Sequence, residues 1–192
     1  MKHGVGMDFT AYIGHRLNKN DLNHMCLELN SNKFIYTQHF LQEILIYNPS
    51  DVNKVWKIET DDWGGTISLD GPCGLTFTFS EHVCMMSHYT RWLTFLLNDL
   101  EFDFRSHLRN VSYELTRYFN TKFAIYVPDS SKKESAIMDF LWEDENKSIE
   151  FMKKWLLEKC GSPKDEIDSI YVDYEDSWES EGYFIDYFID YK

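Results

Sequence analysis

TISLDGPCGLTFTF, residues 66–79, is the segment from which the architecture of this chain is best predicted. Apolar residues alternate with Ser and Thr on either side of a central DGPCG, and this period of two is typical of a strand with one buried face. The central Gly and Pro residues indicate a turn. The segment therefore predicts an antiparallel hairpin whose apolar face is covered and whose Ser and Thr face is open to water.

The rest of the chain alternates between helical and extended periods. Apolar residues three and four positions apart predict helices, and alternating apolar residues predict further strands. The fold class is therefore α+β, a central antiparallel sheet with helices packed mainly on one face in a single domain. The expected helices span 21–29, 37–47, 104–118, 131–141, 146–160 and 163–178, and the further strands span 9–13, 55–60, 123–127 and 183–191.

Helix boundaries are expected where side chains can bond the free amide groups of a first turn. Asp21 and Asn146 are the expected caps of two helices, and Gly161 is the expected end of the second. Ser162 followed by Pro163 predicts that a new helix begins immediately afterwards.

Size and composition fit one globular domain over residues 1–192. With 43% hydrophobic and 17% aromatic residues, the chain can bury roughly 70% of its unfolded surface at this length. Residues 1–7 are candidates for disorder. Residues 163–192 are expected to add an acidic helix and a terminal strand to the same domain.

The formal net charge of −13 disfavours several kinds of partner. Binding to nucleic acid or to an anionic membrane needs concentrated Lys and Arg. The amino end has no apolar secretory run, and the apolar clusters are shorter than the ~18 residues that span a bilayer. Four cysteines without CxxC spacing predict reduced thiols, so the expected compartment is the cytoplasm.

The carboxyl-terminal segment, residues 165–192, carries ten carboxylates against one Lys, interleaved with eight aromatic residues. Aromatic bulk favours a folded segment, and charge of a single sign accelerates encounter with a basic partner. We therefore expect a non-catalytic protein-binding surface that recognises a basic protein. The alternative is an ordinary amphipathic helix and edge strand whose acids serve solubility. The candidate partner-binding residues are Asp168, Glu175, Asp176, Trp178 and Glu179.

A local basic stripe lies on the helix expected at 104–118. Arg105, Arg109 and Arg117 fall outside its apolar face, and Lys122 follows just beyond it. Two interpretations are open for this stripe. It is either a solvated face or an intramolecular partner for the acidic carboxyl-terminal segment.

Two other groupings give rival functions. An extended segment would place His82, Cys84 and His88 on one face, near Cys73, and zinc accepts thiolate and imidazole ligands. The first alternative is therefore a hydrolase or metal-dependent enzyme that uses these four residues. Ordinary strand residues are the simpler interpretation, and no metal or cofactor is predicted. The second alternative is a homo-oligomeric structural protein joined through the exposed edge of 183–191.

Three stretches resemble an uncharacterised bacterial protein family: YIGH at 12–15, SEH at 80–82 and GYFIDYF at 182–188. That resemblance implies no activity and no catalytic residues. In general character, a small acidic α+β chain is similar to the immunity proteins of bacterial toxin systems, which bind a toxin domain, often a basic nuclease. No immunity motif is matched residue by residue. The similarity implies that the acidic surface neutralises a toxin.

Overall fold

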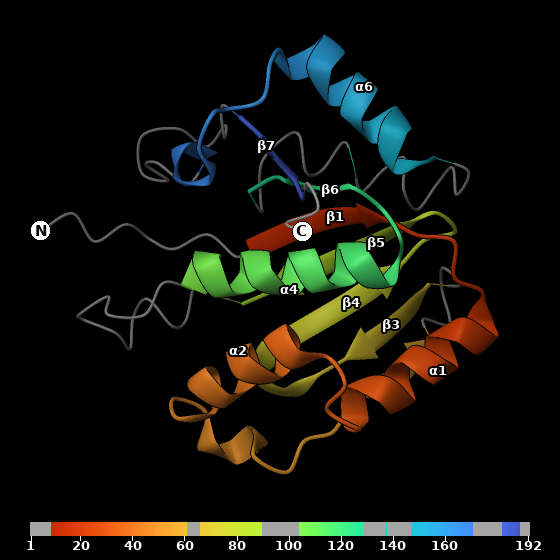
Figure 1. Cartoon of the computed structure of the whole chain (residues 1–192), viewed down its shortest axis with the longest axis vertical. Coiled ribbons are helices and arrows are strands. Elements are labelled where there is room, and N and C mark those ends of the chain that lie inside the picture. Colours follow the sequence, from red (N-terminus) through yellow and green to blue (C-terminus); the bar gives the residue numbers. More distant parts are fainter. Residues whose placement is uncertain are drawn as a thin grey trace, which may run out of the picture.

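The structure is a computed structural model that describes residues 9–60, 66–89, 104–128, 137, 147–170 and 182–188. Its strands are β1 (Phe9–Gly14), β2 (Lys57–Thr60), β3 (Ile67–Asp70), β4 (Leu75–Phe79), β5 (Val83–His88), β6 (Phe123–Tyr126) and β7 (Phe184–Tyr187). They form one seven-stranded antiparallel sheet in the order β2-β3-β4-β5-β1-β6-β7 (Figure 1). This order places β2 and β7 at opposite edges of the sheet.

The hairpin predicted at 66–79 is confirmed as β3 and β4. Ile67 pairs with Phe79, and Leu69 pairs with Phe77. Residues that pair directly across two strands share a face. The apolar residues of the hairpin therefore lie together on the face of the sheet that forms the main core.

The turn between these two strands is shaped by the ring of Trp56. The chain passes through a short 3-10 turn, η2 (Pro72–Gly74). A Cβ added at Gly71, just before that turn, would lie 2.6 Å from the Trp56 indole, which stacks on Phe77 with ring centroids 4.9 Å apart. Glycine is needed here because it admits the indole, and its backbone conformation is ordinary.

Three helices cover the apolar face of the sheet (Figure 1). They are α1 (Lys19–Asn30), α2 (Ile35–Leu45) and α4 (Phe104–Tyr118). Met25, Phe40 and Val111, one from each helix, are fully buried in the same core as Phe77 of the sheet. The expected α+β arrangement, with helices mainly on one face, is confirmed.

Carboxylates define where two of these helices begin. Asn18 Oδ1 accepts the Asp21 amide hydrogen at 3.1 Å, and Asp21 Oδ2 accepts that of Asn18 at 2.8 Å. The predicted cap of α1, Asp21, is therefore the second half of a capping box that begins at Asn18. The first turn of α2 is capped from α4, because Glu114 accepts the amide hydrogens of Tyr36 and Thr37 at 3.0 and 2.9 Å.

The opposite face of the sheet is divided into two halves. Over β1, β6 and β7 it is covered by α6 (Ile149–Cys160), in a second core that includes Tyr12 and Met152. Over β3 and β4 the same face carries hydroxyls such as Ser68 and Thr78, which are partly exposed. The expected open face therefore holds for this half. The prediction of an open face is wrong for the half under α6, where the helix buries apolar residues of β1, β6 and β7.

A serine and a glycine set the boundaries of α6. The helix begins after Ser148, whose Oγ accepts an amide hydrogen of the first turn at 3.2 Å. The predicted cap, Asn146, lies outside the described residues. The helix ends at Gly161 as predicted, with a left-handed φ of +78° that favours glycine. Of the helix predicted at 131–141, only Ile137 is described, and it is buried.

The α-helix predicted to begin at Pro163 is wrong. Residues 163–166 lack helical structure and lead into a 3-10 helix, η3 (Ile167–Ile170), and positions 171–181 lie outside the described residues. The cause is a contact with a distant part of the chain. The Lys164 N–H donates to the Tyr183 carbonyl at 2.8 Å, which holds this segment beside β7.

Two predicted strands are shorter than expected. The strand predicted at 55–60 begins at Lys57, because both backbone groups of Trp56 are bonded by the Asn30 side chain of α1. The strand predicted at 183–191 is observed as β7, and positions 189–191 lie outside the described residues. The side-chain bonds from Asn30 therefore set the residue at which β2 begins.

Candidate acidic interaction surface

Three carboxylates are exposed where η3 begins. Asp165, Glu166 and Asp168 lie at the surface, whereas Ile167 and Ile170 are buried in the main core. The two buried side chains anchor the backbone, and the acids lie outside the core. The segment from Asp165 to Ile170 is named the acidic turn.

The acidic turn is tied to the start of β7. The Lys164 N–H donates to the Tyr183 carbonyl, and the Tyr183 hydroxyl donates to the Gly161 carbonyl, each at 2.8 Å. Gly182 leaves room for this contact, since a Cβ there would lie 2.7 Å from Lys164 Cε. These bonds fix the backbone before any partner binds, and a fixed surface loses less conformational entropy on binding.

Two acids of the carboxyl-terminal segment pair with arginines of α4. Arg105 Nη1 lies 2.5 Å from Asp168 Oδ1, and the two side chains are 43% and 71% exposed. Arg109 Nε lies 2.7 Å from Asp186 Oδ2, and the Asp186 side chain is 13% exposed. The hydrogen bond to Asp186 raises the pKa of Arg109. Intramolecular pairing of the predicted arginine stripe is therefore confirmed at these two positions.

The two ion pairs differ in whether the carboxylate can still contact a partner protein. Arg109 also lies over the Phe184 ring, 5.5 Å from its centroid, so the Asp186 charge is neutralised within the fold. The Asp168 charge stays in water, where an exposed ion pair contributes about 0–1 kcal/mol and is readily exchanged. Asp186 is therefore a structural acid, and Asp168 remains a candidate contact.

Four of the five residues predicted to bind a partner lie outside the described residues: Glu175, Asp176, Trp178 and Glu179. The fifth, Asp168, is in the acidic turn. Sequence patterns single out this residue but miss its neighbours Asp165 and Glu166. The sequence does contain a pattern that could have identified these two acids as exposed. Ile167 and Ile170 are three residues apart and mark the buried side of a short turn, so the acids between and before them face outward.

The rival cluster of Cys and His residues is not assembled as one site. Cys84 and His88 lie in β5 and are buried, whereas His82 precedes the strand and lies 3.8 Å from Glu81. Burial raises the pKa of the Cys84 thiol well above its usual value. Within the described ranges, no three His, Cys, Asp or Glu side chains are grouped so that they could hold a metal ion.

Cys73 occupies a strained and closed position in η2. Its φ is +57°, which is uncommon for a residue with a side chain. Its N–H donates to Asp51 Oδ2 at 2.7 Å, and its carbonyl accepts from His88 Nε2 at 3.0 Å. Burial raises the pKa of the Cys73 thiol to about 11 and lowers the pKa of His88 to about 4. A buried, protonated thiol is a poor nucleophile, so these contacts hold the turn in place.

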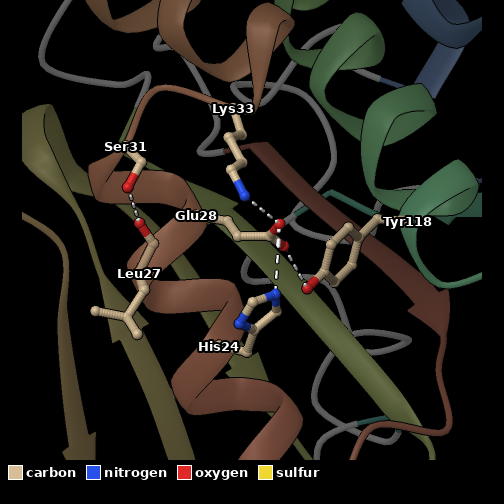
Figure 2. A network of polar contacts seen from close by, with 6 residues as sticks. All are labelled: His24, Leu27, Glu28, Ser31, Lys33 and Tyr118. Atoms are coloured by element: carbon tan, nitrogen blue, oxygen red, sulfur yellow. Dashed lines mark hydrogen bonds and ion pairs between the residues drawn. The ribbon is translucent and has the colours of Figure 1, made fainter.

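A polar cluster between α1 and α4 brings four titratable side chains together (Figure 2). Glu28 accepts hydrogen bonds from Lys33 Nζ at 3.1 Å and from the Tyr118 hydroxyl at 3.0 Å, and His24 Nε2 lies 3.5 Å away. The hydrogen bond from Lys33 is the main cause of the lowered pKa of Glu28. The side chains of the cluster are directed at one another, so it joins the two helices.

Comparisons with family models, with curated proteins and with solved structures gave no match. Among the described residues, no helix combines the length and apolar composition needed to pass through a bilayer. The acidic turn is therefore interpreted from its geometry and charge alone.

Proposed function

We propose that this chain is a non-catalytic protein-binding domain whose acidic turn contacts a basic protein. The observation that carries the proposal is the turn itself, where Asp165, Glu166 and Asp168 are exposed on a backbone anchored by two buried isoleucines. Asp165 and Glu166 present like charges, and Asp168 can join them by exchanging its exposed pair with Arg105 for a contact to the partner. Such a group steers a partner of opposite charge. The net charge of −13 adds attraction at longer range.

The state of the reactive side chains supports binding rather than catalysis. Cys73, Cys84 and His88 are buried, and their pKa values are shifted so that the neutral forms are favoured. Both ring nitrogens of His15 are already hydrogen-bonded, because Nδ1 accepts the Leu17 N–H and Nε2 bonds the Ser80 carbonyl. This histidine is therefore not available as a general base. A hydrolase that used these thiols would first have to expose them to solvent.

The finer form of the proposal is an immunity protein that neutralises a basic toxin. A nuclease binds its polyanionic substrate through Lys and Arg. Carboxylates held against those residues would occupy the place of the phosphates and exclude the substrate. The exposed acids of the turn and the overall negative charge support this form.

The test uses a variant in which Asp165, Glu166 and Asp168 become Asn, Gln and Asn. The partner is sought among basic proteins encoded beside this chain, and the association rate and affinity are measured as a function of salt. We expect the variant to lose about tenfold or more in affinity, because three charge contacts of about 0.5 kcal/mol each are removed. For a nuclease partner, inhibition of its activity should fall in parallel.

The matched control replaces three exposed acids on other elements, Glu43, Glu81 and Glu150, by Gln. Both variants lose three negative charges, so their long-range attraction falls equally. The control should therefore retain most of the affinity. Equal losses in the two variants would show that net charge alone matters, and unchanged binding in both would contradict the proposal.

A further inference from the structure

The β2 edge of the sheet carries two opposite charges that form no ion pair with any described residue. Lys57 and Glu59 lie two residues apart on one face of the strand, and both side chains are exposed. Neither takes part in an ion pair in the portion of the chain that the structure describes. Between them, Ile58 pairs with Leu69 and packs against the main core.

A two-fold axis through Ile58 would satisfy both charges at once. In an antiparallel pair of two β2 strands centred there, Lys57 lies opposite Glu59 of the second copy, and the same contact is repeated across the axis. Pairing centred on Glu59 would oppose two carboxylates, and pairing centred on Lys57 would oppose two ammonium groups. Charge therefore selects a single register, and two-fold symmetry closes the assembly.

Helix α1 fixes where the available edge begins. The Asn30 side chain accepts the Trp56 N–H at 2.9 Å and donates to the Trp56 carbonyl at 3.0 Å, so both backbone groups of that residue are bonded. The edge that remains for a second strand therefore starts at Lys57. The two-fold register centred on Ile58 places its charge contacts within this remaining edge.

Exposed apolar side chains flank the same edge. Val55 is 53% exposed just before β2, and Leu27 is 65% exposed on α1. The neighbour of Leu27, Cys26, donates to the Trp56 carbonyl, which places this part of the helix beside the start of the strand. Figure 2 shows the Leu27 side chain directed away from the polar cluster of α1 and α4. Association across β2 would remove part of this apolar surface from water.

The other edge of the sheet is the poorer candidate, although the sequence offers self-association through 183–191 as an alternative. The Tyr183 carbonyl already accepts the Lys164 N–H, and Asp186 is committed to Arg109. A β7 strand paired with itself about Asp186 would bring two such carboxylates together. In β2 the exposed charges favour self-pairing, because Lys57 of one copy can lie opposite Glu59 of the other.

We propose that two copies of this chain associate edge to edge through β2, antiparallel and centred on Ile58, so that one sheet continues across both copies. The partner at this edge is a second copy of the chain, and the acidic turn at the other edge stays available to the basic protein. The self-association therefore stands independently of the proposed function.

The test is a charge-exchange series on the full chain, followed by sedimentation over a wide range of protein concentrations. Lys57→Glu should weaken self-association by about tenfold or more, and Glu59→Lys should do the same, because each replaces two attractive contacts with two repulsive ones. An equimolar mixture of the two variants should associate again as a heterodimer. The double exchange in one chain should restore the native behaviour.

The control series exchanges Lys154 and Glu158, an exposed ion pair of α6, in the same four combinations. These variants carry the same charge changes and should sediment like the native protein. Circular dichroism confirms that every variant is folded. A native chain that stays monomeric at all concentrations, or single variants whose mixture fails to recover association, would overturn the proposal.

Discussion

The two edge strands, β2 and β7, are both four residues long but are held in different ways. In β7, Asp186 is paired with Arg109. The Lys153 ammonium group lies over the Tyr187 ring, with Nζ 5.2 Å from the ring centroid. In β2, Lys57 and Glu59 are exposed and make no ion pair or ring contact with the residues that the structure describes. An edge strand whose charged side chains are paired within the chain offers no charge to a second molecule. An edge strand with unpaired charged side chains can bind one.

The largest effect is expected at β7. Arg109→Met leaves the mostly buried Asp186 carboxylate without its partner and should lower the free energy of unfolding by about 2–3 kcal/mol. Adding Asp186→Asn should recover about half of this loss. The measurement is urea unfolding at neutral pH. Arg105→Met, which removes the exposed pair with Asp168, is the control and should cost less than about 1 kcal/mol; equal losses would erase the distinction between the two pairs.

Acid should weaken the fold through His88, which lies in the central strand β5 and bonds the Cys73 carbonyl in the turn between β3 and β4. Its pKa is about 4 in the fold against an ordinary 6.5, so between these values the unfolded chain binds a proton that the folded chain does not. Stability should therefore fall as pH drops, by about 2.5 kcal/mol from this group between about pH 7.5 and 4.5.

His88→Gln keeps a donor for the Cys73 carbonyl and removes the titration. Urea unfolding of the native chain and of this variant at both pH values isolates the contribution of the imidazole, because the carboxylates titrate in both proteins. The fall in stability on acidification should be smaller in the variant. An identical fall would mean that the imidazole takes up its proton equally in the folded and unfolded states.

A smaller effect is expected where α1 supports the start of β2. Asn30→Ala removes the two hydrogen bonds to the Trp56 backbone and should lower the free energy of unfolding by about 1–2 kcal/mol. Hydrogen exchange should accelerate at the Trp56 amide and leave β7 unchanged. Asn23→Ala, on the exposed side of the same helix, is the matched control and should stay within about 0.5 kcal/mol. Faster exchange in β7 as well would show that the two edges are not independent.

The smallest effect is expected for the charges of β2 themselves. Lys57→Gln and Glu59→Gln should each change the free energy of unfolding by less than about 0.5 kcal/mol in dilute protein, because neither side chain has a partner within the described chain. The same thermal or urea measurement on Tyr187→Gln in β7 should show a larger loss, since its ring packs against Phe123. A loss above about 1 kcal/mol at Lys57 would mean that β2 is held from within, and the contrast between the edges would fail.

The hairpin at 66–79 could be predicted because its information is local. Alternation within each strand and the Gly and Pro between them specify both the pairing and the buried face. Helix α4 was predictable for the same reason, since Leu108, Val111 and Leu115 repeat at helical spacing and are all fully buried. Patterns of this kind are read over a few residues and do not depend on the rest of the fold.

The acidic turn could not be predicted in the same way. Ser162 and Pro163 form a good local helix start, but the bond from Lys164 to the Tyr183 carbonyl directs the chain along β7 instead. Charge composition leaves two interpretations open for the arginines of α4, a solvated face or pairing with the acidic segment. Which acid meets which arginine depends on β7 lying next to β6, and a single sequence does not specify that order.

The distance between the two edges has a consequence for stoichiometry. Six spacings of about 4.8 Å separate β2 from β7, so these two strands lie about 29 Å apart across the sheet, and the acidic turn follows a residue that is bonded to the start of β7. In a pair joined at β2, the two turns would sit at the far ends of the assembly. Such a pair would be bivalent, binding two basic molecules without mutual obstruction, and would gain avidity for any target that is itself repeated.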